Sequence, residues 1–314
     1  MSIISESSIN QEEKDNFAKY IRHIDLNKED SLNSIKGKNV LLGFCCDEGV
    51  RRNNGKVGAE EGPKYFRKQL SGLSFHHNGM SDKVIYDAGD VVCKQGLLEE
   101  SQIKLGALVK RIICAGGSPI LIGGGHEIAY GHYLGIKESG HFPAILNFDA
   151  HFDLRKTLKE KKGSSGTPFR QIKELLDKEN RQFEYYCSGI QRFANSCELF
   201  NYAKESGVQY QMASDINANP TNMSFVERVI KKHKEIYVTV CLDVFSSEIA
   251  PGVSAPQVLG INPSHVLEAI KMLQESGKVV SFDIAELNPS RDLNERTSKL
   301  SAYIAAEYLY NSKI

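Results

Sequence analysis

The sequence lacks several features that would point to common classes of protein. Its 314 residues contain no tryptophan, which excludes nothing, and no apolar run near the ~20 residues of a membrane-spanning helix. The N-terminus, Met1-Ser-Ile-Ile-Ser-Glu6, has neither the basic segment nor the apolar stretch of a secretion signal. Lysine plus arginine equals aspartate plus glutamate at 39 each, without a basic block. We therefore expect neither a nucleic acid nor a membrane surface as partner.

Cysteines are present, but they lack the spacing of a zinc ribbon. Most of them lie in apolar runs, where a free thiol behaves as a small core residue. The seven cysteines stand at positions 45, 46, 93, 114, 187, 197 and 241. An odd number of free thiols without a secretion signal predicts a reducing compartment, the cytoplasm.

Apolar runs alternate with stretches of helical periodicity along the chain. We expect eight strands, at 38–45, 83–87, 119–123, 143–149, 183–189, 207–211, 236–243 and 279–285. We expect helices at 62–71, 97–115, 126–138, 167–179, 196–206, 222–234, 263–276 and 297–311. This alternation predicts an α/β fold whose mostly parallel sheet is covered on both faces. No linker or repeat divides the chain, so we expect one domain over 36–314 after a polar N-terminal arm over 1–35.

The stretch Asn147-Phe-Asp-Ala-His-Phe-Asp153 follows one of these strands and is the most informative in the chain. It places Asp149, His151 and Asp153 at alternate positions, which share one face of an extended backbone. Two carboxylates and an imidazole form a ligand set that suits Mn²⁺ or a related divalent ion. The alternative is a solvated strand end with acids placed by chance.

Further ligand types follow other predicted strands. In an open α/β sheet, sites form outside the carboxyl ends of the strands. His126 follows Gly123-Gly-Gly, Asp243 ends the strand that includes Cys241, and Asp283 and Glu286 end the last strand. His126 taken alone could instead cap a helix, and Asp283 could equally be the partner in a structural ion pair. A dinucleotide-binding loop would need glycine at 128, where this chain has isoleucine.

These motifs resemble the three metal-binding signatures of the ureohydrolase superfamily, which includes arginases, agmatinases and formimidoylglutamases. The likeness runs from about residue 40 to 308. Four further segments are similar to formimidoylglutamases: Asp47-Glu-Gly-Val-Arg-Arg-Asn-Asn-Gly55, Ser164-Ser-Gly-Thr-Pro-Phe169, Gly189-Ile-Gln-Arg-Phe193 and Ala250-Pro-Gly-Val-Ser-Ala-Pro256.

The resemblance implies a fold, a metal centre and an activity. The fold is the arginase-like three-layer α/β/α architecture with an eight-stranded, mostly parallel sheet, often in an oligomer. The activity is hydrolysis of N-formimidoyl-L-glutamate to L-glutamate and formamide, a late step of histidine degradation, by hydroxide that bridges two Mn²⁺ ions. The metal ligands carry over to His126, Asp149, His151, Asp153 and Asp243.

The chemistry of the substrate indicates the other groups that the site needs. Two metal ions ~3.5–4 Å apart lower the pKa of water towards ~7 and so supply a nucleophile for the unreactive amidine carbon. Glu286 resembles the family residue that faces the cationic formimidoyl group. The substrate carboxylates need arginines or several hydrogen-bond donors. The loop candidates, each of which could instead be ordinary surface polarity, are Arg51, Arg52, Asn54, Arg155, Arg170 and Arg192.

Position 241 departs from the family pattern, in which this strand ends Asp-x-Asp and the first Asp bridges both metals. Here it reads Cys241-Leu-Asp243, and alternation points the thiol into the site. Sulfur is soft and Mn²⁺ prefers oxygen, so we expect weaker Mn²⁺ binding. The site then holds a softer metal, holds one metal only, or is empty and weakly active.

Two other functions remain open at the level of sequence. One is an agmatinase or guanidino-acid hydrolase of the same fold. The absence of histidine from Ser164-Ser-Gly-Thr-Pro-Phe-Arg170, where arginases carry one, disfavours arginase itself. The other is a metal-impaired, non-catalytic relative, which Cys241 favours and the five retained ligands disfavour.

Overall fold

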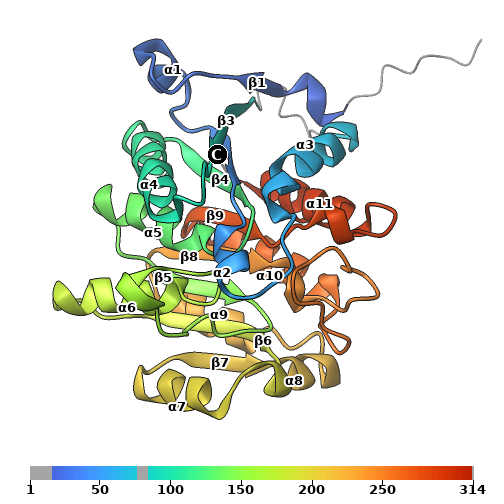
Figure 1. The fold of residues 1–314 in the computed structure, drawn as a ribbon. Coiled ribbons are helices and arrows are strands. Elements are labelled where there is room, and N and C mark those ends of the chain that lie inside the picture. The colour runs from blue at the N-terminus through green and yellow to red at the C-terminus, as the bar shows by residue number, and fades with distance from the viewer. Residues whose placement is uncertain (1–15, 76–83, 313–314) are drawn as a thin grey trace, which may run out of the picture.

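The computed structural model describes residues 16–75 and 84–312 and contains one large sheet. Within these residues the strand order is β1-β3-β2-β4-β9-β8-β5-β6-β7, and every pair of neighbours is parallel. The strands are β1 (Ile21–His23), β2 (Asn39–Cys45), β3 (Ile85–Val92), β4 (Ser118–Gly123), β5 (Ala144–Phe148), β6 (Tyr185–Ile190), β7 (Gln209–Met212), β8 (Ile236–Cys241) and β9 (Val279–Ala285). Figure 1 shows them stacked from β1 to β7.

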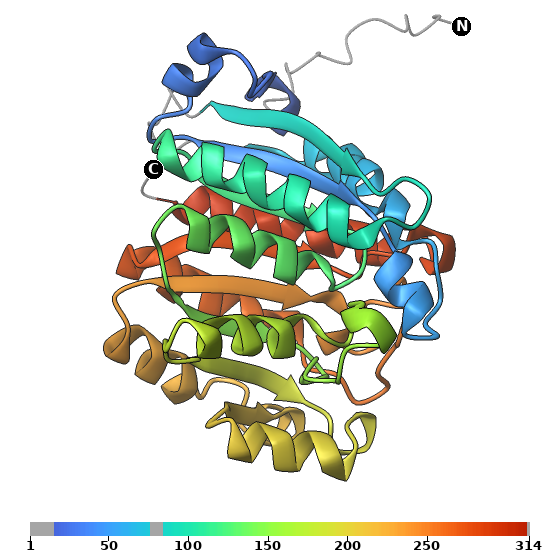
Figure 2. The same ribbon diagram turned by 60° about the vertical axis from the view of Figure 1, so that its left-hand side comes forward.

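Helices cover both faces of the sheet and make three layers, as predicted. One face carries α4 (Leu98–Cys114), α5 (Ile128–Glu138), α6 (Pro168–Lys178) and α7 (Cys197–Glu205), the first three of which lie in front of the sheet in Figure 2. The other face carries α3 (Gly62–Gly72), α8 (Ala213–Ala218), α9 (Ser224–Lys232), α10 (Pro263–Ser276) and α11 (Arg296–Asn311). Every residue of β4, β5 and β8 is buried, because a parallel sheet between two helical layers has no exposed face.

The helix α10 begins with a capped first turn. The Asn262 side chain accepts a hydrogen bond from the backbone N–H of Ser264, and Pro263 occupies the first turn, where its missing N–H costs nothing. The helix ends at Gly277, whose φ of 67° lies in the left-handed region that glycine adopts without strain. In the described part of the chain, no helix is both long and apolar enough to cross a bilayer.

One sequence prediction, the number of strands, needs correction here. The sheet has nine described strands rather than eight, because β1 pairs with β3 at one edge. At three residues with one partly buried side chain, β1 is too short to leave a periodic signal. Residues 16–35 of the predicted arm also hold the buried side chains Phe17, Leu26 and Ile35, so this part is packed against the domain. Residues 1–15 lie outside the described chain, and the boundary at residue 35 stays a prediction.

Candidate metal centre

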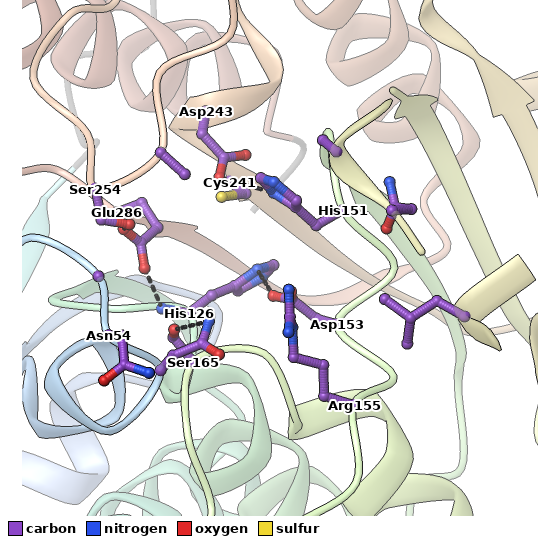
Figure 3. Close-up of a pocket in the computed structure, with 16 residues that line it drawn as sticks. Asn54, His126, His151, Asp153, Arg155, Ser165, Cys241, Asp243, Ser254 and Glu286 are labelled. Carbon is purple, nitrogen blue, oxygen red and sulfur yellow. Dashed lines mark hydrogen bonds and ion pairs between the residues drawn. The ribbon is translucent and has the colours of Figure 1, made fainter. Parts of the chain in front are cut away.

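The predicted ligands gather at the carboxyl ends of four strands that are neighbours in the sheet. The strand order β4-β9-β8-β5 explains why residues far apart in sequence meet there. His126 follows β4, and the Asp149-to-Asp153 stretch follows β5. Asp243 lies in the 3₁₀ turn after β8, and Glu286 follows β9 directly. Figure 3 shows His126, His151, Asp153, Asp243 and Glu286 gathered around one pocket.

The side chains form two overlapping groups of potential ligands. His126, Asp149 and Cys241 make one, and Asp149, His151 and Asp243 make the other, with the ligand atoms of each group within 4.8 Å of one another. Asp149 belongs to both groups and could therefore offer a ligand atom to each.

The distances within the cluster bring all five predicted ligands together. His126 Nδ1 lies 2.9 Å from Asp149 Oδ2 and 2.9 Å from Asp153 Oδ2. His151 Nδ1 lies 3.1 Å from Asp243 Oδ2 and 3.5 Å from Asp149 Oδ1. Asp149 is fully buried and His126 almost so.

Hydrogen bonding leaves the cluster with unpartnered atoms that fit a cation. The Thr239 hydroxyl donates to Asp283, so its oxygen can accept from His126 Nε2 at 3.0 Å. This network assigns the ring proton to Nε2 and leaves a lone pair on Nδ1. Within the described residues no hydrogen bond satisfies Nδ1, although two carboxylate oxygens lie 2.9 Å from it. Asp243 Oδ1 is also buried without a partner. Lone pairs that converge in this way are stabilised by a metal ion.

The electrostatics of the cluster indicate the same need. Burial, together with the charge of Asp149, raises the pKa of Asp153 to about 6. Burial and the charge of Asp243 raise the pKa of Glu286 to about 7. Burial lowers the pKa of His126, but contacts with Asp149 and Asp153 outweigh this effect and raise the pKa well above its ordinary value. The buried carboxylates therefore favour a positive charge among them, whether a proton or a metal ion.

Cys241 points into this cluster, as the alternation along β8 predicts. It is 2% exposed and belongs to the same ligand group as His126 and Asp149. Burial and the surrounding carboxylates raise the pKa of its thiol well above the ordinary value. A bound cation would offset the free-energy cost of forming the thiolate in these surroundings.

Asp283, which the sequence left open between two roles, is a supporting residue. It lies outside both ligand groups. One carboxylate oxygen accepts from Thr239 at 2.5 Å, and the other accepts from Tyr237 and lies 2.6 Å from His132 Nδ1. Thr239 links this fully buried ion pair to His126 and so fixes the orientation of that imidazole. Sequence reasoning missed Thr239 and His132, because their roles depend on contacts between strands and helices.

Glu286 is held at the edge of the cluster by two hydrogen bonds. Its Oε1 accepts from the backbone N–H of His126 at 3.0 Å, and its Oε2 accepts from the Ser254 hydroxyl at 2.5 Å. Its φ of 70° is in the left-handed region, as are those of Asp153 at 48° and Asn54 at 58°. Such conformations are costly for residues other than glycine and concentrate at functional sites.

A cavity of about 250 Å³ opens beside the cluster and takes in some of the predicted substrate-binding residues. Asn54 and Arg155 line it. Arg51, Arg52 and Arg192 do not: the two former are paired with Glu48, and Arg192 is exposed in a 3₁₀ turn. Sequence reasoning did not single out four further lining residues, although three of them lie in the quoted similarity segments: Asn53, Ser165, Asn195 and Ser254.

Comparison with known sequences agrees with these observations. The arginase family profile matches residues 38–310. Formimidoylglutamase from Clostridium tetani is 42% identical over 296 residues, which cover 91% of this chain and 86% of that protein. Formimidoylglutamase from Legionella pneumophila is 41% identical over 286 residues, covering 90% and 88% respectively.

Solved structures share the fold. Bacillus subtilis formimidoylglutamase superposes with a TM-score of 0.84 at 24% identity, covering 99% of this chain and 96% of that chain. Trypanosoma cruzi formiminoglutamase, solved with Mn²⁺, gives a TM-score of 0.79 at 26% identity, covering 87% and 93%. The predicted arginase-like architecture and the likeness to formimidoylglutamases are both confirmed. The chain belongs to the arginase family.

Proposed function

We propose that this protein is a metal-dependent formimidoylglutamase, which hydrolyses N-formimidoyl-L-glutamate to L-glutamate and formamide. The observation that carries the proposal is a single cavity with the ligand cluster at its base, a carboxylate on one side and an unpaired arginine on the other. Formimidoylglutamases from C. tetani and L. pneumophila are the relatives that support the substrate.

Glu286 suits the cationic end of the substrate. It is buried at the cavity wall, and its two hydrogen bonds fix the direction of the carboxylate. A formimidoyl group is a planar cation with N–H donors, and a fixed carboxylate binds such a group by charge-assisted hydrogen bonds.

Arg155 and Asn54 suit the glutamate end. Both line the cavity, and Figure 3 shows Arg155 and Glu286 on opposite sides of His126. Within the described chain no ion pair engages Arg155, so its guanidinium is available to a carboxylate. Agmatine has no carboxylate and would leave this group unused, which disfavours the agmatinase alternative.

We propose that two Mn²⁺ ions bind to His126, Asp149, His151, Asp153 and Asp243. A pair of such ions supplies a nucleophile at neutral pH by lowering the pKa of water towards ~7. Asp149 would contact both ions, since it belongs to both ligand groups. Cys241 provides one sulfur where the family pattern has two carboxylate oxygens, so we expect Mn²⁺ to bind more weakly than it would to an aspartate there.

We also propose a cytoplasmic location. All seven cysteines are free thiols, which fits a reducing compartment. Formation of a homo-oligomer remains an expectation from the family, and sedimentation of the purified protein would test it.

Turnover of matched substrates tests the proposed function. The purified protein with added Mn²⁺ is assayed for product release from formimidoylglutamate, agmatine and arginine. We expect formimidoylglutamate to give the highest kcat/KM. A preference for agmatine would contradict the role of Arg155, and no turnover by either the wild type or Cys241→Asp would favour a non-catalytic relative.

A further inference from the structure

Arg52 forms a dense set of contacts just outside the cavity. Its side chain is only 10% exposed. Nε donates to Glu48 at 2.9 Å, and Nη1 donates to Glu99 at 2.6 Å and to the Gly163 carbonyl at 3.0 Å. Nη2 donates to the Gly96 carbonyl and to Glu99, both at 3.2 Å. A guanidinium has five N–H donors, and these contacts use all of them, so none remains for a substrate.

These contacts join three segments that are far apart in sequence. Glu48 and Arg52 belong to α2 (Glu48–Arg52), Gly96 and Glu99 lie at the start of α4, and Gly163 lies in the loop before α6. Glu99 also accepts from the backbone N–H of Gly163 at 3.1 Å. We call Arg52 with Glu48, Gly96, Glu99 and Gly163 the Arg52 clamp.

The clamp leads directly to the cavity wall that carries Arg155. The residue after Arg52, Asn53, donates to Ser165 at 3.2 Å. The backbone N–H of Arg155 donates to the Gly166 carbonyl at 2.8 Å. A Cβ on Gly166 would lie 2.8 Å from Arg155 Cδ and 3.2 Å from Asn53 Nδ2. The 163–166 segment is therefore in contact with the clamp at one end and with both walls of the cavity at the other.

We propose that Arg52 is a positioning residue, which sets the affinity for the carboxylate end of the substrate without touching it. The clamp fixes α2 against the 163–166 segment, and this contact places Asn54 and Arg155 at the separation that the substrate needs. The inference rests on the proposed function, because Arg155 is its assumed carboxylate-binding group. It replaces the expectation from sequence that Arg52 itself binds the substrate.

The proposal predicts that loss of the clamp weakens substrate binding and leaves the chemistry intact. We expect Arg52→Gln to raise KM for formimidoylglutamate by about ten- to a hundredfold, since a displaced positioning group can cost that much. The value of kcat and the metal content should hardly change, because the clamp contacts no ligand of the metal centre. Arg52→Lys should fall between Arg52→Gln and the wild type, because an ammonium cannot reproduce the guanidinium fork.

Glu99→Gln separates the clamp from direct binding by Arg52. Glu99 lines neither the cavity nor the adjoining hollow that Arg155 and Arg170 share. Its side chain is 42% exposed, so its substitution should leave the fold intact. If Arg52 acts through the clamp, Glu99→Gln should raise KM, and the double variant should resemble the single variants rather than add their effects. If KM falls or stays unchanged in Glu99→Gln, the proposal is wrong. Lys137→Gln is the matched control, because it removes an ion pair to Glu179 between two other elements.

Hydrogen–deuterium exchange of 163–167 provides a readout that needs no turnover. We expect faster exchange there in Arg52→Gln and Glu99→Gln than in the wild type or Lys137→Gln. Unchanged exchange would overturn the clamp, whatever the substrate. Faster exchange with unchanged KM would overturn the positioning role. If the wild type does not hydrolyse formimidoylglutamate, the proposed function fails while exchange still tests the clamp.

Discussion

Cys241 is the residue whose chemistry most affects what this site can do. It belongs to one of the two ligand groups, and its sulfur can offer one donor where a carboxylate offers two. We expect Cys241→Asp to raise Mn²⁺ affinity by at least ~10–100-fold, the usual effect of a single group next to a metal site, and to raise turnover with it.

Metal analysis together with calorimetric titration of Mn²⁺ would check this prediction. Cys241→Asn is the matched control, because it has the shape of aspartate without the charge and should not restore binding. Two tightly bound Mn²⁺ ions per wild-type chain would show that the thiol does not impair the site.

Glu286 is a second residue whose role can be tested by a substitution that preserves its shape and removes its charge. In Glu286→Gln the side chain can still accept from the His126 N–H, but it no longer carries the charge that faces the formimidoyl cation. A lost charge-assisted hydrogen bond costs roughly 1.5–3 kcal/mol, so we expect kcat/KM to fall by about 10- to 100-fold. Steady-state kinetics would measure the fall, and metal content should be unchanged. A variant with wild-type kcat/KM would remove Glu286 from the binding of the substrate.

The sequence predicts the metal cluster well and the substrate loops poorly, for a physical reason. The spacing of Asp149, His151 and Asp153 is a property of an extended backbone, and parallel strands place their carboxyl ends at one edge. The pairing of Arg52 with Glu99 depends on how two loops 47 residues apart approach each other. No local pattern distinguishes such a buried arginine from Arg155, which lines the cavity.

At the scale of elements, the loop between β5 and α6 carries three of the predicted metal ligands and the predicted carboxylate-binding group. We expect Arg155→Gln to raise KM for formimidoylglutamate by about 10- to 100-fold, the cost of one charge-assisted hydrogen bond, with a smaller change in kcat. Lys173→Gln on α6 is the control, because the ion pair of Lys173 is with Asp177 on the same helix. Equal KM values for Arg155→Gln and the wild type would exclude Arg155 from binding the carboxylate.

The sequence also predicts long elements better than short ones. The eight predicted strands all correspond to strands of the sheet. The edge strand β1 and the helix α2 were missed, because three and five residues are too few to establish a period. The short helix α2 carries Arg52 and leads to Asn54, so both proposals depend on an element that the sequence did not predict.

For the whole molecule, the buried acids couple stability to pH. Burial and nearby charge raise the pKa of Glu127 to about 8, and similar causes raise that of Glu286 to about 7 and that of Asp153 to about 6. Between about pH 4 and 8 the folded chain thus keeps protons that the unfolded chain, with ordinary values near ~4, has released. Because the unfolded state binds fewer protons, the free energy of unfolding should fall as pH rises through this range.

Denaturant unfolding of the chelator-treated protein at pH 5 and pH 8 would check this sign, and we expect the lower stability at pH 8. Glu127→Gln should reduce the difference, because a neutral amide can still accept the Gly49 N–H that bonds Glu127 at 2.8 Å. Glu29→Gln on the exposed helix α1 (Glu29–Ser34) should leave the difference in stability unchanged.

Mn²⁺ should restore stability most at pH 8, since it binds the folded state and replaces the missing positive charge. A chelator-treated protein that is more stable at pH 8 than at pH 5 would contradict the view that these carboxyls are buried against one another to hold a cation.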